Sequence, residues 1–315
     1  MANTFAPNGF SQYSGAGSAP TYEQTLAAIQ STNTTPIFLN DPVNPAYTAG
    51  VGNGYITQAV SPVTLTTSAI ATSSAGVLTV TFTAFSATTA NLPTFVSATW
   101  YPPVGSVIVI SGNTAGINGA FTITSSTATT AVVANSGLTV SLSSNSGVAT
   151  VYIPVAGVFA GCKYQSVSQK RTVWSNYWPG SDASTDVEAY VITDPNARFS
   201  VQTGNTATTA TAVGQAQVGE NISFSWNDNT APGETNGIAA TGLSTMFADQ
   251  ATLSSNGTQG PVANAFLPFR VIALQNYLPG QAAPLSGING NDATAGYNKI
   301  VVGFNNAMPR NFAGM

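Results

Sequence analysis

The side chains that could carry out catalysis are few in this sequence. Its 315 residues include no histidine, the usual general base and metal ligand, so sites of the Ser-His-Asp, Cys-His and His-metal types are excluded. The densest acidic group comprises Asp182, Asp186, Glu188 and Asp194. Two such carboxylates could hydrolyse a glycosidic bond and several could ligate Ca²⁺, although their spacing differs from an EF-hand loop. Turn signals around Asp182 and Asp194 favour a plainer role, in which short carboxylates bond the backbone of turns. We therefore expect no catalytic residue, no metal and no cofactor.

Cations and aromatic side chains lie together between residues 170 and 178. Rings beside cations could stack on sugar rings or on single-stranded nucleic acid. Trp, Tyr and Arg are also the residues in which protein interfaces are enriched. We favour a contact between subunits, for which the candidates are Arg171, Trp174, Tyr177 and Trp178.

The composition limits the possible partners. Hydrophobic residues make up 43% of the chain and charged residues only 6%, against about 25% charged in ordinary soluble proteins. Seven Lys and Arg and a net charge of −4 leave little counterion release to drive nucleic-acid binding. The start of the chain lacks a signal-peptide pattern, and no apolar run has the length of a membrane span. We expect neither nucleic acid nor membrane as a partner, and a protein made in the cytoplasm.

The only cysteine is Cys162, so the chain has no internal disulfide framework. Lys163 lies beside it and could activate the thiol. Without a histidine partner, however, the sequence favours a small buried hydrophobic residue at this position.

Alternating residues predict an all-β protein. No Asp, Glu, Lys or Arg occurs between Asp41 and Lys163. Within this gap Leu78, Val80 and Phe82 alternate with threonines, as in a half-buried strand. About six or seven such strands predict an inserted Ig-like β-sandwich over 62–152. The flanking residues 36–61 plus 153–275 then form a base β domain, a barrel or a sandwich.

Both ends of the chain have the composition of extended arms. Residues 1–35 are rich in Gly, Ser, Asn and Pro, and residues 276–315 show little periodicity. The capping-box spacing of Thr21 and Gln24 would start a short helix with Tyr22, Leu26 and Ile29 on one face, or else a frayed turn. Aromatic residues in flexible arms suggest burial on a partner, which adds as interface candidates Phe5, Phe10, Tyr13, Tyr22, Tyr277, Tyr297 and Phe312.

Two groups of segments resemble known phage proteins. The runs AGVFAGCKY at 156–164, WSNYWPG at 174–180 and AYVITDPNARF at 189–199, preceded by PIFLNDPV at 36–43, resemble β-rich head decoration or cement proteins of tailed bacteriophages. The runs VGSVIVISG at 104–112 and NGAFTITS at 118–125 are similar to an uncharged β-module found in phage structural proteins. This chain departs from the shorter family members by carrying that module inside the base domain.

The resemblance implies a structural virion protein rather than an enzyme. Such a protein would sit on the capsid surface, bind the major capsid protein and itself, as a homo-oligomer such as a trimer, and cement the shell after assembly in the host cytoplasm. A tail, fibre or receptor-binding component is the alternative within the virion, and a β-rich glycan-acting enzyme is the third reading. Hundreds of copies per particle would indicate cement, few copies a fibre, and turnover of a polysaccharide an enzyme.

Overall fold

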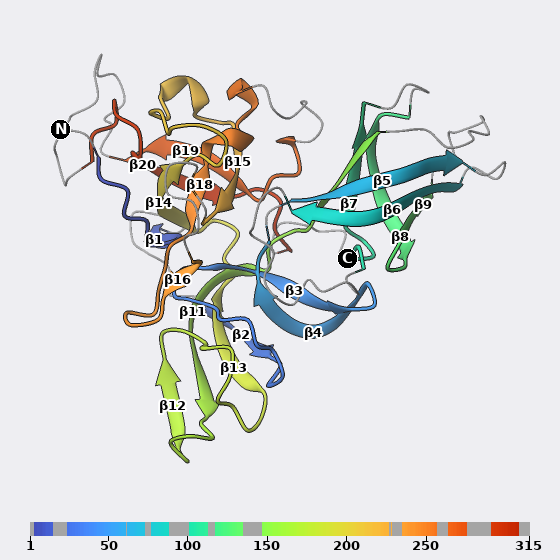
Figure 1. Cartoon of the computed structure of the whole chain (residues 1–315). Coiled ribbons are helices and arrows are strands. Elements are labelled where there is room, and N and C mark those ends of the chain that lie inside the picture. The colour runs from blue at the N-terminus through green and yellow to red at the C-terminus, as the bar shows by residue number, and fades with distance from the viewer. Residues whose placement is uncertain are drawn as a thin grey trace.

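β-strands dominate the computed structural model of the chain, as the alternating pattern predicts (Figure 1). The structure describes residues 3–14, 24–60, 62–72, 77–87, 101–112, 117–134, 147–226, 228, 235–256, 264–275 and 291–308. Short 3-10 helices interrupt the strands at Gln215–Gln217, Gln250–Thr252 and Ser254–Asn256. The strands divide into three main assemblies, which we call the base barrel, the lobe sheet and the inserted barrel.

The base barrel is a nearly closed ring of strands. Its order is β1-β14-β18-β15-β19-β20, and an additional pairing between β14 and β20 joins the last strand to the second. Phenylalanines fill its centre: Phe269 stacks on Phe10 with ring centroids 4.3 Å apart and meets Phe304 at 5.8 Å. Its strands are β1 (Ser11–Ser14), β14 (Arg198–Gly204), β15 (Asn221–Ser225), β18 (Phe247–Asp249), β19 (Phe269–Leu274) and β20 (Lys299–Phe304).

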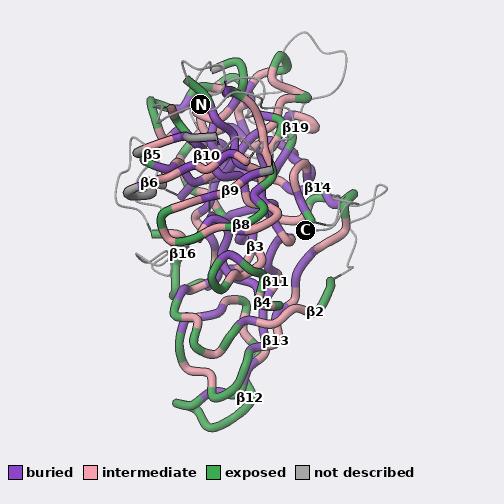
Figure 2. The backbone as a smooth tube through the Cα atoms, turned by 90° about the vertical axis from the view of Figure 1, so that its right-hand side faces the viewer, coloured by how far each residue is buried: buried purple, intermediate pink, exposed green. Residues whose placement is uncertain are grey.

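The lobe sheet extends away from the base barrel and ends in the hairpin that carries β12 (Figures 1 and 2). Its strand order is β2-β13-β11-β3-β4, with β12 paired to β11. Val158 of β11 and Ile192 of β13 belong to the same apolar core as the base barrel, so the two assemblies are packed together. The strands are β2 (Gln24–Ile29), β3 (Pro42–Thr48), β4 (Val51–Gln58), β11 (Gly157–Gln165), β12 (Thr172–Ser175) and β13 (Val187–Ile192). A small ribbon, β16 (Gly237–Ile238) with β17 (Leu243–Ser244), lies beside them.

The inserted barrel contains the strands expected within 62–152, but their arrangement differs from our expectation. They close into a barrel in the order β10-β5-β6-β9-β8-β7, where we expected a two-sheet Ig-like sandwich. The pairing of the long strands β5 and β6 contains bulges. Bulges bend and twist a strand, which helps the sheet to curl until its first and last strands pair. The strands are β5 (Val63–Thr72), β6 (Val77–Ala87), β7 (Val107–Ser111), β8 (Gly119–Ser126), β9 (Thr130–Ala134) and β10 (Val148–Tyr152).

The prediction of flexible arms was wrong where the structure describes the ends of the chain. β1 pairs with β14, β2 pairs with β13 along six positions, and β20 lies between β14 and β19. The short helix expected near Thr21 is also wrong from Gln24 onwards, where β2 runs instead. Pairing with β13 decides the outcome here, because tertiary contacts override the weak local preference for a helix. Residues 15–23, 276–290 and 309–315 of the predicted arms lie outside the described residues.

Candidate functional site

The acidic residues singled out from the sequence each have local partners. Asp182 accepts hydrogen bonds from Ser166 Oγ at 2.6 Å and from the backbone N–H of Ser168 at 2.7 Å. These bonds lower the pKa of Asp182. Asp194 accepts from the N–H of Asn196 at 2.8 Å, which is the turn role that its sequence context predicts. Within the described residues no three His, Cys, Asp or Glu side chains are grouped so that they could hold a metal.

Asp186 and Glu188 are engaged in other ways. Asp186 accepts from the N–H of Ser31 at 3.0 Å and from the hydroxyl of Tyr55 at 2.7 Å, which tie the start of β13 to neighbouring segments. Glu188 accepts from the hydroxyl of Tyr190 at 2.7 Å and lies 3.5 Å from Lys163 Nζ. The hydrogen bond from Tyr190, followed by the charge of Lys163, lowers the pKa of Glu188.

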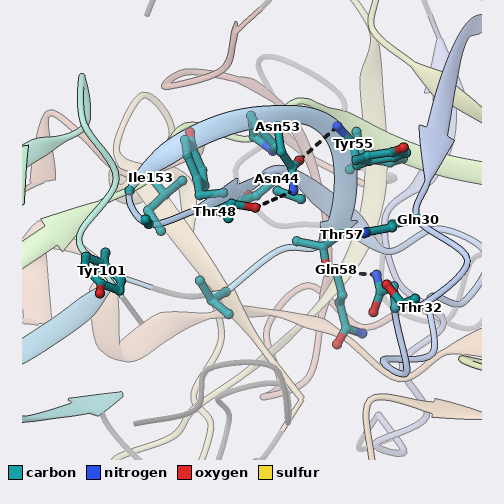
Figure 3. A pocket seen from close by; sticks show the side chains of 18 of the residues that line it. Gln30, Thr32, Asn44, Thr48, Asn53, Tyr55, Thr57, Gln58, Tyr101 and Ile153 are labelled. Atoms are coloured by element: carbon teal, nitrogen blue, oxygen red, sulfur yellow. Dashed lines mark hydrogen bonds between the residues drawn. The ribbon is translucent and has the colours of Figure 1, made fainter. Parts of the chain in front are cut away.

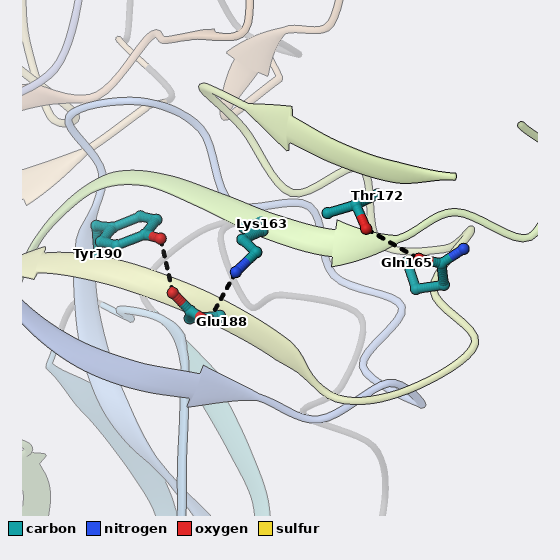
Figure 4. A network of polar contacts seen from close by, with 5 residues as sticks. All are labelled: Lys163, Gln165, Thr172, Glu188 and Tyr190. Atoms are coloured by element: carbon teal, nitrogen blue, oxygen red, sulfur yellow. Dashed lines mark hydrogen bonds and ion pairs between the residues drawn. The ribbon is translucent and has the colours of Figure 1, made fainter. Parts of the chain in front are cut away.

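The outward face of the lobe sheet carries Trp174, the most exposed aromatic residue among those that the structure describes. Trp174 is 67% exposed and stacks on Tyr190 with ring centroids 5.8 Å apart and planes 11° apart. Lys163 Nζ lies 5.2 Å from the Trp174 ring centroid, a cation–π distance. Figure 4 shows how Lys163 reaches across from β11 to Glu188 on β13. We call this surface the outer face, and its edge strand β2 adds Leu26, which is 63% exposed.

The other candidates near Trp174 lie elsewhere. Arg171 is exposed at the hairpin tip, where its Nε donates to Gln169 Oε1 at 3.0 Å. Tyr177 stacks on Phe38 with centroids 5.6 Å apart. Trp178 is fully buried and donates from Nε1 to the carbonyl of Asn33 at 3.2 Å. A contact role for Trp178 is therefore wrong, because its ring belongs to this chain's own core.

The aromatic residues of the predicted arms are divided in the same way. Phe10 is fully buried in the base barrel, so it too is a core residue rather than a contact residue. Phe5 packs against Tyr297 with centroids 5.0 Å apart, and Tyr13 is 50% exposed on β1. The remaining three candidates, Tyr22, Tyr277 and Phe312, lie outside the described residues.

Cys162 is a buried residue, as the sequence favours. Its thiol lies on the opposite side of β11 from Lys163, is 1% exposed and contacts the carbonyl of Tyr177 at 3.4 Å. Burial raises the pKa of this thiol to about 12. The neighbouring lysine therefore does not activate it.

A pocket of about 350 Å³ lies at the seam between the lobe sheet and the inserted barrel (Figure 3). The β3–β4 hairpin forms most of its wall, residues 30–34 close one side, and Tyr101 and Ile153 reach it from the flanks of the inserted barrel. The two-residue turn Ala49-Gly50 has positive φ at both positions, as a tight hairpin requires. The carbonyl of Gly50 accepts from the N–H of Val104 at 2.8 Å, which fixes the hairpin tip against the inserted barrel.

Two polar side chains of this pocket are left without partners. Both amide atoms of Asn44 and the hydroxyl of Tyr47 are buried and have no hydrogen-bond partner among the described residues. Asn44 is 3% exposed, and burial raises the pKa of Tyr47 to about 12. Sequence reasoning missed both residues. The available signal was an Asn-Pro step inside a strand pattern, since Asn and Pro are depleted in strands.

Sequence reasoning also missed three buried carboxylates, Asp41, Asp228 and Asp249. Asp249 accepts from the hydroxyl of Thr206 at 2.7 Å, and Asp228 accepts from the N–H of Asn205 at 2.8 Å. Burial raises the pKa of Asp249, and the charge of nearby Asp228 adds to the effect. Both acids hold the loop that follows β14, so their arrangement explains local structure rather than catalysis.

Comparisons with known proteins give no relative for this fold and site. No protein-family model, no curated protein and no solved structure matches the chain. Among the described residues, none of the helices has both the length and the apolar character needed to cross a bilayer.

Proposed function

We propose that this chain is a structural virion protein that decorates and stabilises a bacteriophage capsid by binding the major capsid protein. The outer face of the lobe sheet is the observation that carries the proposal. Trp174 on this face is 67% exposed. Burying such a side chain on a partner would be favourable, because aromatic residues supply much of the energy of protein interfaces. The same face has a single lysine–glutamate pair, so little charge must be desolvated on contact.

The free edge of the sheet supports this assignment. In the described part of the chain β2 hydrogen-bonds only with β13, so its other edge, which carries exposed Leu26 and approaches β4, is unpaired. Open edges are sites where another chain can add a strand. The two barrels, by contrast, close most of their edges within the molecule. We therefore assign capsid binding to the outer face. We also propose that the chain forms a closed homo-oligomer such as a trimer.

Binding to capsids tests the proposal directly. Purified protein is mixed with capsids that lack it, and the bound fraction is measured by sedimentation. We expect wild-type protein to bind and Trp174→Ala to bind at least about tenfold more weakly, because truncating a central aromatic residue typically costs more than about 1 kcal/mol. Val148→Ala is the control, since Val148 is 50% exposed on the inserted barrel. Equal binding of the Trp174 variant, or no binding of wild type, would contradict the proposal.

A tail, fibre or receptor-binding component is the second candidate. The uncharged pocket favours it, because receptor-binding proteins need a site for a ligand outside the particle. Quantitative mass spectrometry of purified particles separates the two. Hundreds of copies per particle support capsid decoration, whereas a few copies support the second candidate.

A further inference from the structure

The pocket at the seam has a lining without charge. Among the described residues 19 line the pocket, and none of them is Asp, Glu, Lys or Arg. A charged ligand would lose its hydration there without gaining a counter-charge, and this costs several kcal/mol. Anions such as phosphates and carboxylates are therefore poor ligands for this site. Asp186 bonds the hydroxyl of Tyr55 at one rim, which adds negative charge outside the lining and further disfavours anions.

The lining is also too polar for a purely apolar ligand. Side-chain amides and hydroxyls surround the pocket, and Figure 3 shows them on both strands of the β3–β4 hairpin. Several are already paired: Asn53 donates to Thr48 Oγ1 at 3.1 Å, and Asn33 donates to Thr57 Oγ1 at 3.3 Å. These bonds hold the wall in place before any ligand binds.

The unpaired amide of Asn44 is the feature that calls for a ligand. A buried polar group without a partner costs roughly 1 to 3 kcal/mol, so proteins rarely keep one. At Asn44 both the donor and the acceptor are unpaired among the described residues, and the hydroxyl of Tyr47 nearby in β3 is unpaired as well. A ligand that offers adjacent hydroxyl groups could satisfy both atoms of an amide, because each hydroxyl both donates and accepts.

We propose that this pocket binds an uncharged polyhydroxylated ligand, a short neutral glycan, and that the side-chain amide of Asn44 and the hydroxyl of Tyr47, which lie just beneath the lining with almost no accessible surface, turn into the pocket to bond it. The pocket's volume of about 350 Å³ lies at the small end of ligand sites, which suits one or two sugar rings. Tyr47, Tyr55 and Tyr101 in the lining offer ring faces against which the apolar side of a sugar can pack. The inference stands on the pocket alone and does not depend on a role in the capsid.

The full-length protein is tested on an array of neutral and anionic glycans. We expect wild-type protein to retain neutral glycans and to prefer them to sulfated or sialylated ones. Asn44→Leu, which keeps the branched shape of the side chain but is larger and has no hydrogen-bonding group, is expected to bind at least about tenfold more weakly. Asn196→Leu is the matched control, because Asn196 is exposed in a turn outside the lining and should bind as wild type does.

Thermal unfolding of the same variants separates ligand binding from a structural role. Because Asn44→Leu removes an unpaired amide, we expect the ligand-free variant to melt higher than wild type, by about 2 °C or more. A lower melting temperature would mean that the amide supports the fold and would overturn the proposal. The proposal is also overturned if wild-type protein retains no neutral glycan, or if Asn44→Leu binds glycans as well as wild type does. Equal binding by Asn44→Leu would mean that the amide holds an ordered water only.

Discussion

At the scale of single residues, Asp41 is a buried carboxylate whose ionisation should affect stability. It is fully buried where the chain enters β3, and its Oδ2 accepts from the N–H of Phe38 and from Gln58 Nε2, each at 2.8 Å. A hydrogen bond from the side chain of Ser244 also favours the ionised form of Asp41. Burial outweighs these hydrogen bonds and raises the pKa of Asp41 from 3.8 to about 7. The neutral acid is therefore the form that the folded protein accommodates best.

This raised pKa predicts how stability depends on pH. Between pH 4 and 7 the unfolded chain ionises Asp41 while the folded protein keeps it protonated, so the contribution of this group to the free energy of unfolding falls across that window. Above pH 7 the loss is complete. Asn at this position cannot ionise. Asp41→Asn should therefore melt higher than wild type at pH 8, and its melting temperature should decrease less between pH 4 and pH 7.

The measurement is the melting temperature of both proteins at half-unit steps from pH 4 to 8. Asp194→Asn serves as the control, because Asp194 lies in a turn and bonds only a nearby backbone N–H. Parallel curves for wild type and Asp41→Asn would show that Asp41 does not titrate in this window.

At the scale of elements, Asp182 organises the hairpin that joins β11 to β12. Its carboxylate accepts from Ser166 Oγ and from the N–H of Ser168, and Ser166 Oγ in turn accepts from the N–H of Gln169 at 2.9 Å. The left-handed backbone at Asp182, with φ of 89°, places both oxygens toward the turn. One side chain thus holds three residues of the hairpin tip.

Replacing Asp182 should loosen this tip alone. In Asp182→Ala we expect the amide hydrogens of Ser168 and Gln169 to exchange faster by about tenfold, since each such bond contributes roughly 1 kcal/mol. Exchange in β13 and the melting temperature should change little because the tip is exposed. Hydrogen exchange followed by NMR measures this. In wild type the pKa of Asp182 is lowered, so the same protection should persist below pH 3.8 and be lost only as the pH falls through the lowered value.

The strands with a strict alternating pattern were the predictable elements. Leu78, Val80 and Phe82 of β6 are all buried, as the period-two pattern requires. β2 shows the opposite case: Leu26 and Ile29 have helical spacing, yet Ile29 is buried and Leu26 is exposed because the segment pairs with β13. Closure of the inserted barrel was also beyond prediction, since it depends on bulges and on which strands meet at the ends.

The candidate site was less predictable than the fold. Trp174 was a candidate from its sequence neighbourhood and is exposed on the outer face, while its role in a contact stays a prediction. The pocket was not found, because it combines the β3–β4 hairpin with Tyr101 and Ile153, which only the fold brings together. Asn44 becomes informative only when its lack of partners is known, and this is a property of packing rather than of spacing.

At the scale of the whole molecule, the inserted barrel has a core of its own. Leu78, Ile110 and Val133 belong to a buried cluster that draws almost entirely on β5 to β10, and within the described residues these strands pair only with one another. Outside this cluster, its contacts with the rest of the chain include Val109 and Tyr152 against Leu267 and the hydrogen bond from Val104 to Gly50. Chain entry near Val60 and exit near Ile153 lie next to each other, because β5 and β10 are paired neighbours.

This organisation predicts that residues 62–152 fold when expressed alone. A closed barrel satisfies its backbone groups internally, and its core does not require side chains from the base barrel. The fragment should give dispersed NMR signals and unfold cooperatively. It exposes Tyr152 and Val109, which Leu267 covers in the full chain, so Val109→Thr, an exchange of similar volume, should improve its solubility without unfolding it. The corresponding deletion of 62–152 removes Tyr101 from the described lining of the pocket but leaves Asn44, Tyr47 and the outer face in place. The shortened chain should therefore still bind capsids and should bind neutral glycans more weakly, because the ring of Tyr101 is lost. An unfolded fragment, or a deletion that abolishes capsid binding while the remaining chain stays folded, would contradict this division of roles.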